Sequence, residues 1–291
     1  MHHRAVVAGA ASVVLSLASA ARPAEFELDV EALVFRVLDV RPLDSPFGAP
    51  ATSQDLEGLG VRAGAGFAPG DGADAFRIVF QRTEDDFDGS SISDQAVRGG
   101  LRSRTHFEAT TLDALWRRRI AADGAFGFYS EVGYRYLDTD QSQTIEYDYE
   151  CRPVCPLFSA GGSVGLRGHG VRAGFRLDRA LGGVARFEAA GGLGLLSARE
   201  RLKQRGPILV MPMASTPVPP DFEWSRSVRR AVMTLDLAAR VTVEWKRLGL
   251  TVGYRFERWT PGGFLAEGEA VAVDGFTAGL RYRFGEASHE P

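Results

Sequence analysis

The chain has 291 residues, with 34 Lys or Arg against 37 Asp or Glu, and its formal net charge at pH 7 is −3. This near balance gives no reason to expect a nucleic-acid partner, which calls for a strongly basic surface. The length is sufficient for one large domain.

The first twenty residues have the pattern of a secretory signal peptide. Arg4 belongs to a short basic start, residues 5–18 are apolar, and Ala18-Ser19-Ala20 fits a cleavage site. The apolar run is too short for a transmembrane helix, which needs about 20 residues. We therefore predict a signal peptide at 1–20 and a single mature domain at 21–291.

Ten segments of the mature chain alternate between apolar and polar residues with a period of two, which predicts strands with one apolar face. They cover 26–34, 59–67, 76–81, 112–117, 126–136, 171–178, 185–195, 233–245, 250–257 and 276–284. The apolar face of the last segment ends in aromatics and is the expected signal for the barrel assembly machinery. Its residues are Phe276, Leu280, Tyr282 and Phe284.

The connections between these segments alternate between short and long. Tight turns follow the second, fourth, sixth and eighth segments. The other connections are long, at 39–56, 83–104, 138–166, 199–230 and 260–273. An even strand number with alternating turn lengths is typical of bacterial outer-membrane barrels. The predicted fold is therefore all-β: a transmembrane antiparallel up-and-down β-barrel of ten strands, within a range of eight to twelve, with both termini in the periplasm.

A secreted soluble barrel or sandwich is the alternative, because alternation alone does not say which face points inward. The apolar faces end in aromatics next to the short turns, for example at Trp116, Trp245 and Phe284. Such aromatics form an interfacial girdle in membrane barrels. This favours the membrane barrel, with outer-membrane lipid around the apolar face.

In that orientation the lumen is filled by opposite charges in nearly equal numbers. The predicted lumen charge network consists of Glu27, Asp29, Glu31, Arg62, Arg77, Asp113, Arg117, Glu131, Arg135, Arg172, Arg176, Asp178, Arg186, Glu188, Asp236, Arg240, Glu244, Arg255, Glu257, Arg281 and Arg283. A barrel of about ten strands is nearly filled by its own side chains, so a plug of ion pairs is expected. An open diffusion pore for small polar solutes is the alternative.

The same reasoning predicts ion pairs where the first and last strands close the barrel. Arg283 is expected near Glu27 or Asp29, and Arg281 near Asp29 or Glu31.

Two cysteines, Cys151 and Cys155, lie in one segment. In an oxidising compartment they are expected to form a small disulfide. The acidic segment 84–91 lacks the ligand spacing of a calcium loop and is expected to be a solvated loop, without a metal. The segment 208–220 combines an apolar run with prolines, and a lid over the mouth or a partner site are its two interpretations.

No catalytic motif occurs, and neither an enzyme nor a cofactor is expected. His106 and His169 lie toward the external rim, where a barrel hydrolase of the omptin type has its site. Their parity matches that of apolar neighbours, which places both outside the lumen. The hydrolase is therefore the third hypothesis.

Short stretches of the chain resemble the Legionella-type major outer membrane protein family. They are 111–116, 131–137, 170–175, 252–259 and 279–284. The resemblance implies an outer-membrane barrel that is porin-like or surface-exposed, and it carries over no catalytic residues. Seven residues follow Phe284, whereas the family usually ends at the aromatic.

Overall fold

The computed structural model describes residues 24–38, 56–69, 73–92, 99–149, 158–207, 221–261 and 270–284. The predicted signal peptide, Cys151, Cys155 and the segment 208–220 lie outside the described residues. No helix in the described part of the chain is long and apolar enough to cross a membrane.

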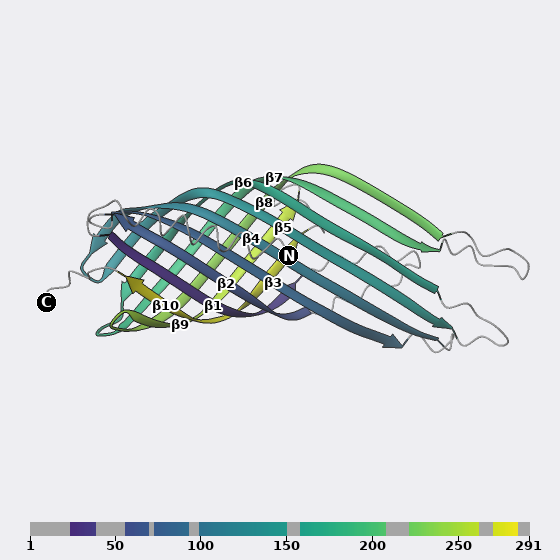
Figure 1. Cartoon of the computed structure of the whole chain (residues 1–291), viewed down its shortest axis with the longest axis horizontal. Helices are drawn as coiled ribbons and strands as arrows, with labels where there is room; N and C mark the ends of the chain where they lie inside the picture. Colours follow the sequence, from purple (N-terminus) through teal and green to yellow (C-terminus); the bar gives the residue numbers. More distant parts are fainter. Residues whose placement is uncertain are drawn as a thin grey trace, which may run out of the picture.

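Ten antiparallel strands form one closed barrel (Figure 1). The strands are β1 (Ala24–Leu38), β2 (Leu56–Pro69), β3 (Asp74–Ile92), β4 (Gly99–Asp123), β5 (Phe126–Tyr149), β6 (Phe158–Ala180), β7 (Ala185–Pro207), β8 (Asp221–Trp245), β9 (Leu248–Pro261) and β10 (Val271–Phe284). Each strand pairs with its neighbours in sequence, and β1 pairs with β10. The predicted ten-stranded up-and-down barrel is confirmed.

One end of the barrel, called the short-turn end below, is built from tight connections after β4, β6 and β8. Backbone angles that favour glycine occur there: φ is 42° at Gly124, 104° at Gly182 and 48° at Gly183. Lys246 adopts φ 56° in the turn after β8. Glycine removes the steric penalty at three of these four positions, so the chain reverses within a few residues.

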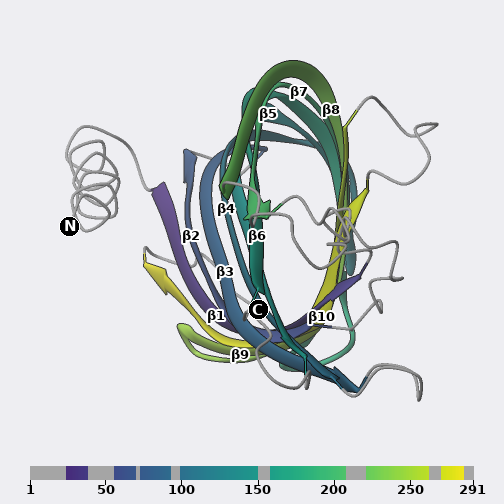
Figure 2. The ribbon, with the colours of Figure 1, turned by 90° about the vertical axis from the view of Figure 1, so that its right-hand side faces the viewer.

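The opposite end reaches much further than the sequence pattern predicted. The expected loops 83–104, 138–166 and 199–230 are largely strand, because β3 to β8 continue through them. β4 to β8 have 23–25 residues, whereas a membrane-spanning strand needs about 9–11. Their far halves, called the overhang below, run past β1, β2, β9 and β10, as Figure 1 shows. Figure 2 looks along the barrel from this end. Outside a membrane the outer face need not be apolar, so the alternation that marks the strands is lost.

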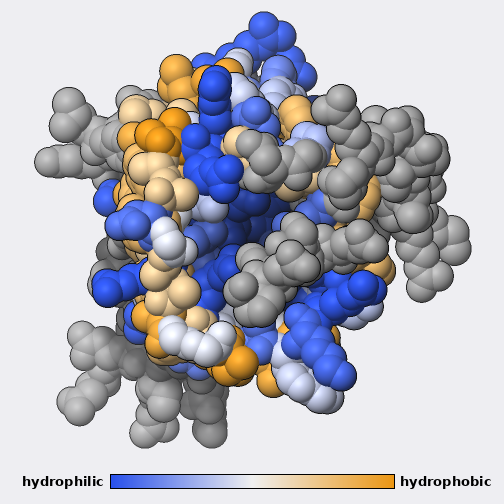
Figure 3. Space-filling model, turned by 90° about the vertical axis from the view of Figure 1, so that its left-hand side faces the viewer, coloured by the Kyte–Doolittle hydropathy of each residue, from blue (hydrophilic) through white to orange (hydrophobic). Residues whose placement is uncertain are grey.

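Near the short-turn end, apolar side chains face outward and charged side chains face the lumen. Val30, Leu250 and Phe276 expose 55%, 60% and 71% of their surface, while Asp29 and Arg281 on the same strands are buried. Figure 3 looks onto this end and shows hydrophilic residues in the centre with hydrophobic residues around them. This is the inverse of a soluble barrel, and it fits a lipid environment.

Further from the short turns, the lumen becomes apolar. A cluster of buried side chains from eight of the ten strands fills it. Its members are Leu33, Phe35, Val37, Phe107, Ala109, Leu137, Leu166, Leu196, Ala198, Val232, Trp259 and Val273. This set is called the apolar layer below.

The closed sheet makes a prediction about gel mobility. A barrel in which every strand is paired has no edge from which unfolding can start, so it should stay folded in SDS until it is boiled. Unheated and boiled samples of the refolded mature protein should therefore migrate at different positions. Identical migration, or a helical circular dichroism spectrum, would contradict the fold.

Candidate functional site

Glu188 on β7 is the centre of the charged part of the lumen. It accepts hydrogen bonds from Arg281 Nη1 at 2.6 Å and Nη2 at 2.9 Å, and from Arg176 Nη2 at 2.7 Å. Arg240 Nε donates to Oε2, the oxygen that also accepts from Arg281 Nη2. Glu188 is only 2% exposed. One carboxylate therefore compensates three guanidinium groups from β6, β8 and β10, which ties together strands that are not neighbours.

A second cluster lies around Arg135, which is fully buried. Its Nε and Nη2 both lie 2.6 Å from the oxygens of Asp113 on the neighbouring strand. Arg135 Nη1 also lies 3.1 Å from Asp236, across the lumen on β8. Arg172 holds that same carboxylate in a fork at 2.9 and 2.5 Å, and it lies 3.4 Å from Glu131. Two-pronged Arg–carboxylate contacts are the strongest ion pairs available to a protein, and here they span the barrel.

The first and last strands close the barrel in the register Glu27↔Arg283 and Asp29↔Arg281. Arg283 Nε lies 3.6 Å from Glu27, as the sequence predicted. Arg281 lies opposite Asp29 in the register as predicted, but the predicted ion pair was wrong, because its partners are Glu27 at 3.5 Å and Glu188. Arg62 on β2 and Arg77 on β3 bind Asp29 instead. For Arg281, the carboxylate of Glu188 across the lumen thus replaces the register neighbour Asp29 as ion-pair partner.

The other predicted lumen residues are distributed between these clusters and the short-turn end. Arg62 and Arg240 share Glu31, at 3.1 and 2.8 Å. Further pairs are Arg176–Asp178 at 2.8 Å, Arg255–Glu257 at 2.5 Å, Arg283–Glu244 at 3.0 Å and Arg186–Glu244 at 3.9 Å. Arg117 departs from the ion-pair scheme, because its guanidinium lies over the ring of Tyr129, 5.1 Å from the centroid.

Glycine on the lumen face makes room for these long side chains. A Cβ atom built at Gly192 would lie 2.5 Å from Arg172 Nη2. Arg172 therefore lies across the position where a side chain on β7 would project. The small residue is needed for the fork between Arg172 and Asp236.

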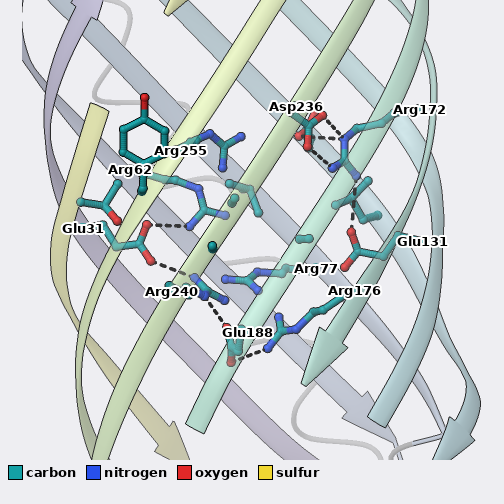
Figure 4. A pocket seen from close by; sticks show the side chains of 18 residues that line it. Glu31, Arg62, Arg77, Glu131, Arg172, Arg176, Glu188, Asp236, Arg240 and Arg255 are labelled. Carbon is teal, nitrogen blue, oxygen red and sulfur yellow. Dashed lines mark hydrogen bonds and ion pairs between the residues drawn. The ribbon is translucent and has the colours of Figure 1, made fainter. Parts of the chain in front are cut away.

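A small polar cavity of about 60 Å³ remains between the two clusters (Figure 4). Arginine and carboxylate side chains from both clusters line it, including Glu31, Arg77, Arg172 and Glu188. One bound water needs about 10–15 Å³ by the same measure, so the cavity holds a few waters. Within the described residues, the charged part of the lumen is thus filled by its own side chains.

The apolar layer was missed from the sequence. Phe35, Phe107, Leu137 and Val232 are at most 1% exposed inside the barrel. Their parity is a usable signal: Phe35 is in phase with Glu31, Leu137 with Arg135, and Val232 with Asp236. Extending each lumen face beyond its charged residues would have found the layer.

The two histidines that were considered for a hydrolase site, His106 and His169, lie on the outer face of the barrel. His106 lies 2.7 Å from Asp86, and His169 stacks on Tyr134 with ring centroids 5.9 Å apart. The expected acidic loop at 84–91 is part of β3, and Glu84 pairs with Arg82 at 2.8 Å. Among the described residues, no group of three or more His, Cys, Asp and Glu side chains could hold a metal ion.

The predicted assembly-signal residues face outward on β10. Phe276, Leu280, Tyr282 and Phe284 are all exposed large hydrophobic residues. The rings of Tyr282 and Phe284 pack edge to face with centroids 4.5 Å apart. These side chains form one apolar stripe along the last strand.

Several solved outer-membrane proteins are similar in structure to this chain at low sequence identity. No protein-family model and no curated protein matches the chain. The outer membrane protease OmpT from Escherichia coli is 10% identical with a TM-score of 0.49, and the match covers 90% of this chain and 97% of OmpT. Ail, the attachment invasion locus protein of Yersinia pestis, is 10% identical with a TM-score of 0.35, over 90% of this chain and 100% of Ail. Neisserial surface protein A is 11% identical with a TM-score of 0.33, over 89% of this chain and 97% of that protein.

The position of Glu188 makes a prediction about stability. Glu188→Gln should lower the free energy of unfolding by about 3–5 kcal/mol, because it leaves buried arginines without a counter-charge. The urea-induced unfolding of the refolded protein, followed by tryptophan fluorescence, measures this loss.

Glu244→Gln is the matched control, because Glu244 also binds arginine but its side chain is 25% exposed at the short-turn end. Water compensates the charge there, and the loss should be clearly smaller. Equal losses for the two variants would show that the centre of the lumen is as wet as its end.

Proposed function

We propose that the protein is an outer-membrane barrel with a plugged lumen, a surface or structural protein whose conductance is low. One observation carries this proposal: two different seals are stacked inside the barrel. The first is the charge network around Glu188 and Arg135, and the second is the apolar layer. An ion would have to displace paired guanidinium groups and then lose its hydration among Phe35, Phe107 and Leu137. Both steps are unfavourable.

The open diffusion channel remains the second hypothesis, and it requires a continuous water path. The small volume of the central cavity argues against one. A hydrolase is the third hypothesis. We propose that the protein is not an enzyme, since His106 and His169 face the exterior with Asp86 and Tyr134 as their neighbours. A catalytic group at the external mouth would have to face the lumen or its rim.

The location follows from the same arrangement. We propose outer-membrane lipid around the apolar outer face, both termini in the periplasm, and insertion by the barrel assembly machinery through the stripe on β10. The short-turn end then lies at the periplasm, and the overhang lies outside the cell. The signal peptide, the Cys151–Cys155 disulfide and membership of the Legionella-type major outer membrane protein family stay predictions.

Conductance in planar bilayers tests the plug. The refolded mature protein should show no steady open state. In a background in which Phe35→Ala and Phe107→Ala open the apolar layer, removing the Arg135–Asp113 fork with Arg135→Ala and Asp113→Ala should increase the current, because it widens the water space in the remaining seal. The control pair, Arg82→Ala and Glu84→Ala, lies on the outer face and should leave the current unchanged.

A steady open state in the wild-type protein would contradict the plug and support the diffusion channel. An equal effect of the two pairs of substitutions would show that the current does not pass through the lumen.

A further inference from the structure

Three arginines stand side by side on the outer face of β6, β7 and β8. The register pairs Arg167 with Arg199, and Arg199 with Arg229, so they are directly opposed on neighbouring strands. Asp138 on β5 is paired with Arg167 at the end of the row. Like charges in directly opposed positions destabilise a sheet. Such a row therefore calls for a negatively charged group to balance it.

The chain supplies only part of that balance. Arg167 binds Asp138 through Nε at 3.0 Å and Nη2 at 2.8 Å. Arg199, Arg201 and Arg229 are exposed and make no ion pair with another side chain in the described part of the chain. The positive charges of Arg199, Arg201 and Arg229 are thus not balanced by another side chain in the described part of the chain.

The row lies on a hollow of the outer surface with a volume of about 510 Å³. Four arginines and two aspartates contribute to its lining: Arg167, Arg199, Arg201, Arg229, Asp138 and Asp140. Formal charges give the hollow a surplus of two positive charges. Its size and charge suit a phosphorylated group, which arginine binds through two parallel hydrogen bonds.

The hollow lies next to exposed apolar residues of the outer face, and this indicates which phosphorylated compound it binds. On β7 the outward residues Leu193 and Leu195 expose 52% and 54% of their surface, and Arg199 follows after one small residue, Ser197. The same change occurs on β6 between Val171 and Arg167. A molecule with acyl chains against the leucines would place its headgroup at the arginines. A free anion would not contact the apolar side chains of Leu193 and Leu195.

At two other places on the outer face, charges at the same transition are neutralised by the chain. Arg82 lies 2.8 Å from Glu84 and 3.3 Å from Glu108. Arg36 lies 3.2 Å from Asp274. At Arg36 and Arg82 the chain thus balances its own charge, whereas at Arg199 and Arg229 it does not.

We propose that this hollow binds the phosphorylated headgroup of a glycolipid in the outer leaflet. Arg199 and Arg229 hold the phosphate, and Arg201 and the Arg167–Asp138 pair border it. The proposal rests on the proposed outer-membrane location and adds a specific lipid site to it. Lipid bound at this site would attach β6–β8 to the outer leaflet where the overhang begins.

Native mass spectrometry of the refolded full mature chain in detergent tests the site, with bisphosphorylated lipid A as the probe. Dephosphorylated lipid A and inorganic phosphate are the comparison ligands. The phosphorylated lipid should bind more tightly than either. Arg199→Gln and Arg229→Gln should each weaken its binding about tenfold, the loss expected for one charge-assisted hydrogen bond. Arg82→Gln removes a neutralised arginine from the same register row and should have no effect.

The outcomes separate the two proposals. A chain that gives no heat-modifiable folded form contradicts the membrane barrel itself. A folded barrel that binds both lipids equally, or that keeps its affinity in the Arg199→Gln and Arg229→Gln variants, overturns only the lipid site. Inorganic phosphate that binds as tightly as the lipid would show that the hollow recognises a free anion, which overturns the lipid assignment.

Discussion

Every side chain of a closed barrel faces either the lumen or the surroundings, and this constraint governs the rest of the structure. Where lipid surrounds the barrel, charged groups can only point inward, and they must neutralise each other there. Where water surrounds it, the outer face can be charged and the lumen can hold apolar side chains. The chain uses both arrangements on the same strands. On β7, Leu195 faces outward and Glu188 inward, whereas further along Arg199 faces outward and Leu196 inward.

The two seals in the lumen follow from this change of surroundings. Glu188 and Arg135 connect strands across the barrel through ion pairs, which replace the packing that a soluble barrel obtains from an apolar core. The apolar layer supplies that packing further from the short-turn end, with members on β1, β9 and β10 as well as on the long strands. The side chains that fill the lumen thus account together for the closure of the barrel, its stability and its proposed low conductance. The arginine row on β6–β8 marks the level at which the outer face changes from apolar to charged residues.

Much of the fold could be predicted because lipid forces a strict alternation on the strands. Segments such as 233–245 and 276–284 have an apolar residue at every second position, and both are strands. The overhang could not be found in this way. In β5 beyond Asp138, polar residues occupy both faces, so no period of two is left to detect. Residue parity placed Arg135, Arg172 and Glu188 in the lumen, and they are buried there. It could not choose their partners, because the reach of an arginine across the lumen depends on the curvature of the closed sheet.

A spin-label scan along β7 tests the change of polarity most directly. Single cysteines would be placed at Leu193, Leu195, Leu196, Ala198 and Arg199, with Cys151 and Cys155 replaced by Ser, and the protein reconstituted in lipid vesicles. Labels at 193 and 195 should be accessible to oxygen from the lipid, and the label at 199 to a water-soluble nickel complex. Labels at 196 and 198 should be shielded from both reagents. Ready access of the nickel complex to 193 and 195, or to 196 and 198, would contradict the account.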